Sequence, residues 1–419
     1  MYHIRNWILF SLFLPVISSN SFAQYPGWTV YDTSNSDLPN NTVYSITIEG
    51  KIKWIGTYHG GLAKFDGTNW TVYNTNNSNL SSNTVGEIAI EDSIKWIATE
   101  WGLTKFDGTN WNVYKESNSG LPNDHINSIA IENTVKWMGT FDGLAKFDGT
   151  NWNVYNPGNP GLSDNTIWSI AIDDSTKWIG TNGSGLAKFD GNNWTFYDTS
   201  NSELPDNWIH AMAMEGITKW IGTVSGGLAK FDGTNWTVFK TSNSGLPHND
   251  VRALAIEGSN IWIGTNGGGL AKFDGTNWTV YDTSNSGLPH NDVRALAIEG
   301  NNIWIGTDGG GLALYNTTGV EEQSNLDFGF RNLDLKIGEN PFSQSTVITY
   351  SVHPNNYYTN TLLTIYDLSG RCVKTLINEL KPAGSYSTTL SANDLKTGIY
   401  FLTLNTNGTK ATKKLILIR

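Results

Sequence analysis

Two sets of positions in this chain combine aromatic and charged residues in a way that suits ligand binding. Both sets recur every 41 or 42 residues, and the residue type changes from one recurrence to the next. The first set is Tyr44, Gly86, Asn127, Trp168, His210, Arg252 and Arg294. The second set is Tyr58-His59, Glu100-Trp101, Phe141-Asp142, Asn182, Val224-Ser225, Asn266 and Asp308. Aromatic rings can stack on sugar or peptide faces, and the polar groups can supply hydrogen bonds and charge.

Ten of these residues are therefore candidate ligand-binding residues. They are Tyr44, Tyr58, His59, Trp101, Asp142, Trp168, His210, Arg252, Arg294 and Asp308. The competing interpretation is neutral variation at exposed loop tips, which need only be soluble. Trp208 lies close to the first set and fits either interpretation.

Catalysis is the less favoured chemistry for these positions. A glycosidase needs two carboxyl groups about 5–10 Å apart, and the candidate acids Glu100, Asp142 and Asp308 come from separate repeats. We find no Ser-His-Asp arrangement, HExxH motif or phosphate-binding loop. The Asp residues that recur in F-D-G are better explained as hairpin-turn residues than as metal ligands. A non-enzymatic binding protein is favoured, while an extracellular carbohydrate-active enzyme and a structural adhesin or spacer remain alternatives.

The two sets belong to a repeat of about 42 residues that occurs seven times between Trp28 and Tyr315. Its text is K-W-I-G-T, then G-L-A-K-F-D-G-T-N-W-T-V-Y, then S-N-S-G-L-P. In the first copy, four short strands are predicted at 43–48, 53–57, 62–65 and 70–73, separated by Gly, Asn, Asp and Ser turns. Both tryptophans of the repeat are expected in the core. Four antiparallel strands per repeat are typical of one propeller blade.

The phase of the repeat predicts how the blades form a ring. A W-T-V-Y strand at 28–31 precedes the first copy, whereas Asn316-Thr317-Thr318-Gly319 replaces the outer strand of the last copy. We therefore expect an all-β, seven-bladed β-propeller whose N-terminal strand completes the last blade. An open β-solenoid is the alternative. Because strand 1 of a blade begins where strand 2 ends, both variable sets are expected at one mouth of the central channel.

The copies resemble two-component regulator propeller repeats. The resemblance rests on G-L-P with V-R-A-L-A-I-E at Gly287–Glu299, W-I-G-T at Trp304–Thr307, and G-G-L-A-L at Gly310–Leu314. In that family such propellers often form periplasmic sensors of hybrid histidine kinases that commonly respond to glycans. This sequence shows no membrane helix and no segment of kinase size after the repeats. The resemblance therefore implies the fold and a glycan as the first ligand class, with a protein partner next, but not a kinase role.

The segment after the repeats is predicted to be a small Ig-like β-sandwich. It resembles the C-terminal sorting domain of type IX secretion cargo from the Bacteroidetes, through Glu339–Phe342, Ile365–Arg371, Ala383-Gly384, Leu395 with Gly398–Tyr400, and Lys413–Leu415. The sorting-motif residues are Asn340, Pro341, Phe342, Gly370, Gly398, Tyr400, Lys413 and Lys414. The resemblance implies contact with the type IX secretion machinery, passage across the outer membrane, removal of the tail, and secretion or attachment to the cell surface. An Ig-like accessory domain is the alternative.

The remaining sequence features predict the domain boundaries and exclude some classes of partner. A basic start, the apolar run Trp7–Ile17 and Ser21-Phe22-Ala23 predict a signal peptide at 1–23. The propeller is expected at 24–316, a linker at 317–336 and the sorting domain at 337–419. The net charge of −11 argues against a nucleic-acid partner. The single cysteine, Cys372, excludes an intramolecular disulfide and is expected to fill the core. We expect no metal or cofactor, no membrane span in the mature chain, and a monomer.

Overall fold

The computed structural model describes residues 25–158, 162–318, 335–352, 359–368, 370–382, 384–406 and 409–418. The predicted signal peptide and most of the predicted linker lie outside the described residues, as do Ser369 and Ala383 of the sorting motifs. The chain divides into two compact units, residues 1–322 and 323–419. Each unit is described by itself. Among the described residues there is no helix of the length and apolarity that a bilayer crossing requires.

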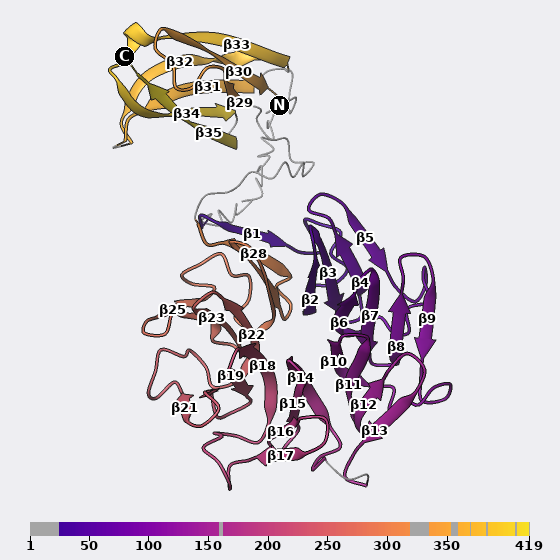
Figure 1. Ribbon diagram of the computed structural model, residues 1–419. Coiled ribbons are helices and arrows are strands. Elements are labelled where there is room, and N and C mark those ends of the chain that lie inside the picture. Colours follow the sequence, from indigo (N-terminus) through magenta and orange to yellow (C-terminus); the bar gives the residue numbers. More distant parts are fainter. Residues whose placement is uncertain are drawn as a thin grey trace, which may run out of the picture. The chain divides into compact units, whose positions relative to one another are not determined.

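Within the described residues, the first unit consists of seven four-stranded antiparallel sheets, which are the blades of a propeller (Figure 1). The first strands are β2 (Val43–Glu49), β6 (Val85–Glu91), β10 (Ile126–Glu132), β14 (Ile167–Asp173), β18 (Ile209–Glu215), β22 (Val251–Glu257) and β26 (Val293–Glu299). The second strands are β3 (Ile52–Thr57), β7 (Ile94–Thr99), β11 (Val135–Thr140), β15 (Thr176–Thr181), β19 (Thr218–Thr223), β23 (Asn260–Thr265) and β27 (Asn302–Thr307).

The outer half of each blade contains its third and fourth strands. The third strands are β4 (Gly61–Phe65), β8 (Gly102–Phe106), β12 (Gly143–Phe147), β16 (Leu186–Phe189), β20 (Leu228–Phe231), β24 (Gly269–Phe273) and β28 (Leu312–Asn316). The fourth strands are β5 (Trp70–Tyr73), β9 (Trp111–Tyr114), β13 (Trp152–Tyr155), β17 (Trp194–Tyr197), β21 (Trp236–Phe239), β25 (Trp278–Tyr281) and β1 (Trp28–Tyr31).

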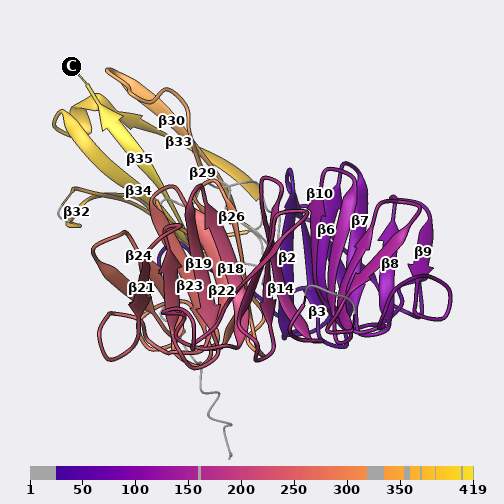
Figure 2. The ribbon, with the colours of Figure 1, turned by 60° about the horizontal axis from the view of Figure 1, so that its bottom comes forward.

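The predicted closure of the ring is confirmed. The last blade has the strand order β1-β28-β27-β26, so its outer strand comes from the N-terminal side of the chain. β1 pairs antiparallel with β28, and Trp28 lies opposite Tyr315 while Tyr31 lies opposite Leu312. The first strands pack against one another in ring order, from β2 through β6, β10, β14, β18 and β22 to β26, which contacts β2. They surround the centre in Figure 1, and β2, β6, β10 and β14 are seen from the side in Figure 2.

The hydrophobic core lies between neighbouring blades. One cluster joins Trp54 and Leu62 of the first blade to Val85 and Ile97 of the second. The glycine of W-I-G-T permits this approach, because a Cβ on Gly56 would lie only 2.7 Å from the Val85 Cγ1. The tryptophans of the second strands are buried, as expected. The tryptophans of the fourth strands are only half-buried, except Trp28. The fourth strand is the outermost strand of its blade, so its residues are less covered by the neighbouring blades.

A charged contact repeats between the blades. Lys136 Nζ lies 2.7 Å from Glu91 Oε1 of the preceding blade, and the Trp96 indole N–H donates to Glu91 Oε2 at 2.9 Å. The same lysine lies 4.7 Å from the centre of the Trp96 ring. Within the described residues, equivalent ion pairs join five of the seven blade interfaces. Ile261 and Ile303 stand at the lysine position in the other two.

The second unit is a two-sheet sandwich, as predicted. One sheet has the order β29-β30-β33, with β29 (Leu335–Ile337), β30 (Ser345–Val352) and β33 (Gly384–Ser391). The other has the order β32-β31-β34-β35, with β32 (Cys372–Lys381), β31 (Thr359–Tyr366), β34 (Gly398–Thr406) and β35 (Thr409–Leu417). A short 3-10 helix, η1 (Ala392–Asp394), follows β33.

The expectation that Cys372 fills the core is wrong. Cys372 begins β32, a strand that the sequence pattern did not predict, and its side chain is exposed. The strand escaped prediction because most of its residues are exposed or half-buried, so its sequence carries no clean apolar alternation.

The ion pairs between blades generate a prediction about stability. Lys136→Ala should lower the free energy of unfolding by roughly 2–4 kcal/mol, since Glu91 would keep its partly buried charge without its partner. Urea unfolding followed by tryptophan fluorescence measures the change. Lys51→Ala, at an exposed lysine, is the control. Equal effects of the two substitutions would show that the contact between blades contributes nothing.

Candidate functional site

The two variable sets lie at the same end of the blades. In the first blade, Val43 at the start of β2 pairs with Thr57 at the end of β3, and the Tyr58 N–H donates to the Thr42 carbonyl. The same pairing of strand ends recurs in the other blades. Residues that follow the second strand and residues that begin the first strand therefore meet at one mouth of the channel.

Each residue of the first variable set occupies a β-bulge. In every blade the register between the first and second strands shifts around this residue: Val43 and Ser45 pair with the neighbouring strand, and Tyr44 between them does not. The shifts in the other six blades fall at Gly86, Asn127, Trp168, His210, Arg252 and Arg294. A bulge releases a residue from the regular alternation of the strand and redirects its side chain. The propeller thus presents seven independently variable residues towards its channel.

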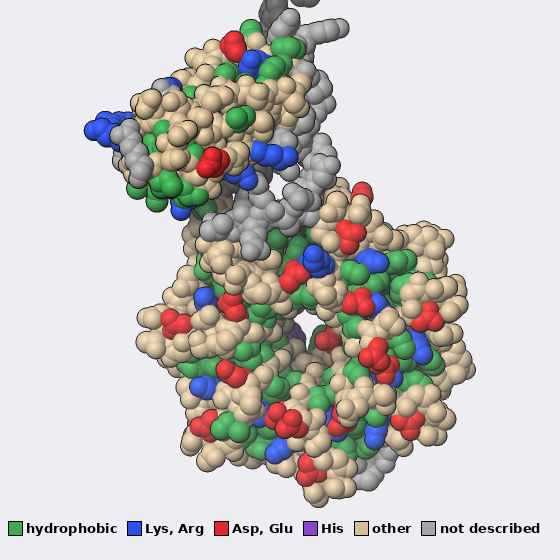
Figure 3. All heavy atoms as spheres, turned by 45° about the horizontal axis from the view of Figure 1, so that its top comes forward, with side chains coloured by type: hydrophobic (Ala, Val, Ile, Leu, Met, Phe, Trp, Pro, Cys, Tyr) green, Lys and Arg blue, Asp and Glu red, His purple; other side chains and the backbone are tan. Residues whose placement is uncertain are grey.

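All seven bulged residues line one cavity of about 520 Å³. The other residues that line it are Thr84, Glu100, His125, Ile126 and Phe141. A second cavity of about 250 Å³ shares the seven bulged residues and continues along the following residues of the first strands. In the space-filling view the channel is open at the centre of the ring (Figure 3). We call the first cavity the mouth and the second the channel cavity.

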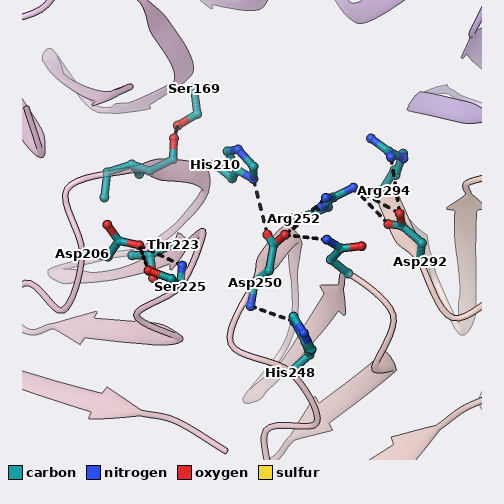
Figure 4. Close-up of polar contacts among 12 residues, drawn as sticks. Ser169, Asp206, His210, Thr223, Ser225, His248, Asp250, Arg252, Asp292 and Arg294 are labelled. Carbon is teal, nitrogen blue, oxygen red and sulfur yellow. Dashed lines mark hydrogen bonds and ion pairs between the residues drawn. The ribbon is translucent and has the colours of Figure 1, made fainter. Parts of the chain in front are cut away.

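An ionic network forms one side of the mouth (Figure 4). Arg252 contacts Asp250 at 3.2 Å and Asp292 at 3.1 Å. Arg294 contacts Asp292 at 3.3 Å and Asp308 at 2.6 Å. Carboxylates on both sides of each guanidinium group hold the two arginines in place. The charges on this side of the mouth are therefore largely paired.

The acids of this network titrate differently. Burial alone would raise the pKa of Asp250, but hydrogen bonds from His210 and Asn266 and the charge of Arg252 outweigh it and lower this pKa to about 2. Burial raises the pKa of Asp292, and the charges of Arg294 and Arg252 only partly compensate. Asp250 is the more firmly ionised of the two because it also accepts the Asn266 amide N–H at 2.8 Å.

Aromatic side chains form the other side of the mouth. The Tyr44 and Tyr58 rings lie 5.7 Å apart, and the Trp168 ring lies 5.2 Å from the His210 ring. His125 stacks on Phe141 with ring centres 4.0 Å apart and an angle of 9° between the planes. A flat ligand could therefore contact aromatic faces on one side and polar groups on the other.

The ten sequence-predicted residues fall into three groups. Tyr44, Trp168, His210, Arg252 and Arg294 line the mouth. Tyr58, His59 and Asp308 are outside the lining but contact it, through the Tyr44 ring, Thr84 Oγ1 and Arg294. Trp101 and Asp142 are not brought into the lining: Asp142 accepts the Asn123 amide N–H at 2.7 Å, and Trp101 is 60% exposed.

Sequence reasoning missed Thr84 and His125, which line the mouth, and Asp250 and Asp292, which lie outside the lining and form ion pairs with its arginines. All four stand two positions before a bulged residue. That column also varies between copies, so a wider comparison of the repeats would have found it. Glu87 is a different case, because it is a single departure in a column that otherwise holds serine and alanine.

Glu87 is the carboxyl group that lines the channel cavity in the described part of the chain. Its Oε2 accepts the backbone N–H of Ile129 in the next blade at 2.7 Å. Burial raises the pKa of Glu87 to about 7, and the hydrogen bond from Ile129 offsets only part of that increase. Near neutral pH this carboxyl group is therefore partly protonated.

The repeated aspartates of F-D-G form hairpin turns. Asp66 Oδ1 accepts the backbone N–H groups of Thr68 at 2.8 Å and Asn69 at 2.7 Å. Equivalent bonds occur in five further copies, at Asp107, Asp148, Asp190, Asp232 and Asp274. Backbone and side-chain bonds from Asn110 and a backbone bond from Thr109 lower the pKa of Asp107 to about 2. In the part of the chain that the structure describes, no cluster of three or more His, Cys, Asp or Glu is placed to hold a metal ion.

The sorting-motif residues hold the end of the chain in the sandwich. The Asn340 side chain donates to the Lys414 carbonyl and accepts from the Ile416 N–H, both at 2.8 Å. The Asn340-Pro341 peptide is cis, and buried Phe342 forms a parallel bridge with Leu417.

The other motif residues have different placements. Gly370 has a φ of 78° in the turn after β31, and Gly398 begins β34. The hydroxyl of buried Tyr400 donates to the Lys396 carbonyl at 2.8 Å. Lys413 and Lys414 are exposed on β35. The asparagine, aromatic and glycine residues thus have structural roles, and the lysines face solvent.

Comparisons with protein families match parts of both units. Residues 340–418 match the secretion system C-terminal sorting domain, and residues 245–267 and 287–309 match the two-component regulator propeller. The chain has no match among curated proteins.

Several solved structures share the fold. The extracellular domain of the putative hybrid two-component system BT4673 from B. thetaiotaomicron is 15% identical with a TM-score of 0.60, over 94% of this chain and 60% of that one. PorZ, an essential bacterial surface component of the type-IX secretion system of Porphyromonas gingivalis, is 15% identical with a TM-score of 0.55, over 90% of this chain and 60% of that one. YCF48 bound to D1 peptide is 18% identical with a TM-score of 0.52, over 72% of this chain and 97% of that one.

These likenesses show the propeller fold, and the chain spans about 60% of the length of the first two proteins. The sorting domain marks the chain for type IX export to the cell surface or the outside, and implies contact with that secretion machinery. The chain is therefore a surface or secreted protein built from two-component regulator propeller repeats and a C-terminal type IX sorting domain.

Proposed function

We propose that this protein is a non-enzymatic binding protein whose propeller holds a ligand at the mouth of its channel. One observation supports the proposal above the others. The seven bulged residues, which differ in type while the blades around them repeat, all line the same cavity. Ring closure alone brings these seven positions together, but a merely soluble surface does not need the aromatic and charged groups that line the cavity. A mouth of about 520 Å³ suits a small ligand or one end of a larger one.

A saccharide is the ligand class that fits this mouth best. Tyr44 and Trp168 supply flat apolar faces, while Asn127 and His210 supply hydrogen-bonding groups between them. Sugar rings have apolar faces and polar edges, which such a mixed lining matches. The surface location set by the sorting domain supports a ligand that the cell meets outside. A protein partner is the next ligand class.

An extracellular carbohydrate-active enzyme is a second candidate, favoured by Glu87. A carboxyl group with its pKa raised to about 7 is suited to act as a general acid near neutral pH. A glycosidase also needs a second carboxylate. The nearby candidates, Asp250, Asp292 and Asp308, all form ion pairs with arginines. Incubation of each bound saccharide with the protein, followed by a search for new reducing ends or unsaturated products, separates binding from turnover.

Trp168→Ala and Tyr44→Ala should each weaken binding of a saccharide, found by array screening, at least tenfold. Loss of one stacking face removes about 1.5 kcal/mol, and 1.4 kcal/mol corresponds to a factor of ten. Isothermal titration of purified variants measures the change. Ile217→Ala, at an exposed apolar residue in the turn between β18 and β19 at the opposite end of the blades, is the matched control. Unchanged affinity in both mouth variants would contradict the proposed binding site.

Trp101→Ala should change the affinity for the same saccharide by less than threefold, since Trp101 lies outside the lining of the mouth. The same titration measures this. A loss as large as that of Trp168→Ala would contradict a ligand confined to the mouth and extend the site over the rim.

A further inference from the structure

The outward face of the four-stranded sheet in the sandwich carries a contiguous apolar patch. Tyr400 of β34 is buried in the sandwich, so its neighbours Ile399 and Phe401 point outward, and they are 38% and 39% exposed. Tyr366 of β31 lies directly opposite Phe401. Ile416 of β35 lies directly opposite Ile399. Because residues directly opposite each other share a face, these four side chains form one patch across three strands.

The outward face of the three-stranded sheet is different. On β33 it presents Ser385, Ser387 and Thr389, all of them exposed. Among the described residues of that sheet, the exposed large apolar side chain is Val347. Single exposed apolar residues are ordinary on soluble proteins, whereas a contiguous group of them marks an interaction surface. The patch therefore singles out one face of the sandwich.

A lysine of the sorting motif lies beside this patch. Lys414 of β35 is directly opposite Phe401, and its side chain is exposed. In the described part of the sandwich, ion pairs join Arg371 to Asp367 and Lys381 to Glu379, and none includes Lys414. The asparagine, aromatic and glycine residues of the motif have roles in the fold, but Lys414 has no such role. Its positive charge is available to a partner.

The backbone edge of β35 is already occupied. The Asn340 side chain bonds the Lys414 carbonyl and the Ile416 N–H. The Phe342 N–H donates to the Ile416 carbonyl at 3.1 Å, and the Ile418 N–H donates to the Phe342 carbonyl at 3.0 Å. A partner that added a strand to this edge would have to displace these bonds. What β35 presents to a partner is therefore its side chains on the face of the sheet.

The family match indicates the kind of partner. Residues 340–418 match the secretion system C-terminal sorting domain, which implies contact with the type IX machinery. Aromatic and aliphatic side chains beside a positive charge fit a protein surface that has an apolar pocket and a carboxylate at its edge. A large aromatic residue at the centre of such a contact contributes most to affinity, and a charged residue at its rim contributes to specificity.

We propose that the type IX secretion machinery binds the outward face of β34 and β35, at Ile399, Phe401, Ile416 and Lys414. Phe401 and Ile399 enter an apolar pocket of the machinery, and Lys414 pairs with a carboxylate beside it. The export signal is thus recognised as a folded surface, to which Asn340 contributes by holding β35 in place. This inference concerns the sorting domain and is independent of the proposed ligand at the mouth of the propeller.

The test measures export of the full chain from a bacterium that possesses the type IX machinery. Immunoblots of the periplasm, the cell surface and the medium give the exported fraction. Phe401→Ser and Lys414→Glu should each lower this fraction roughly fivefold or more, because the first removes the central apolar contact and the second places two negative charges together. The retained protein should resist added protease as well as the unaltered chain does, which shows that it is folded.

Val347→Ser and Lys336→Glu are the matched controls, since both residues are exposed on the other sheet. Each should leave the exported fraction within about twofold of the unaltered chain, as is usual for surface substitutions. Should Phe401→Ser lose its protease resistance, Lys414→Glu decides, because Lys414 is exposed.

Three results would overturn the proposal. The first is full export of folded Phe401→Ser or of Lys414→Glu. The second is equal retention of the matched controls, which would show that the effect is not confined to this face. The third is normal export with loss of the variants from the cell surface to the medium, which would assign the face to surface attachment instead. None of these results bears on the proposed binding site of the propeller.

Discussion

The pairing of β1 with β28 is the constraint on which the rest of the propeller depends. Each blade buries its apolar faces against two neighbours, and the clusters that link Trp54 to Val85 and Trp262 to Val293 contain residues of adjacent blades. A row of such blades would leave one apolar face uncovered at each end. Completing the last blade with the N-terminal strand joins these two ends, so that β26 packs against β2. The closed channel, its mouth and the convergence of seven bulged residues all follow from this closure.

The bulge explains how a repeated scaffold can hold an irregular site. Each blade keeps the residues that pack against its neighbours, among them the W-I-G-T glycines that allow the next strand to approach. The bulged residue is outside the regular pairing, so its identity is free of that packing requirement. The glycine at position 86 and the arginine at position 294 occupy the same place in their blades. Residue variation can therefore accumulate at the mouth without disturbing the ring.

The sequence predicted the parts of the fold that depend on the local pattern of residues and on the number and phase of the repeats. The strands of the repeats, the missing outer strand after Tyr315 and the closing strand at Trp28–Tyr31 all follow from repeat phase. Features that depend on which residues meet within and between blades were not predictable in this way. The examples are the bulges, the arginine network at the side of the mouth, the half-burial of the outer tryptophans, and Glu87, which has no ion partner among the described residues. The exposure of Cys372 was missed because β32 itself was missed.

The most direct measurement of ring closure is a cross-strand disulfide in solution. Thr29 of β1 lies opposite Leu314 of β28, a spacing that suits a disulfide between paired strands. In a Cys372→Ser background, the pair Thr29→Cys with Leu314→Cys should cross-link under mild oxidation, as detected by mass spectrometry of the digested protein. Thr29→Cys with Lys272→Cys places the second cysteine at the same position of the preceding blade and should remain reduced. Cross-linking of the control pair, or of neither pair in a folded protein, would contradict the closed ring.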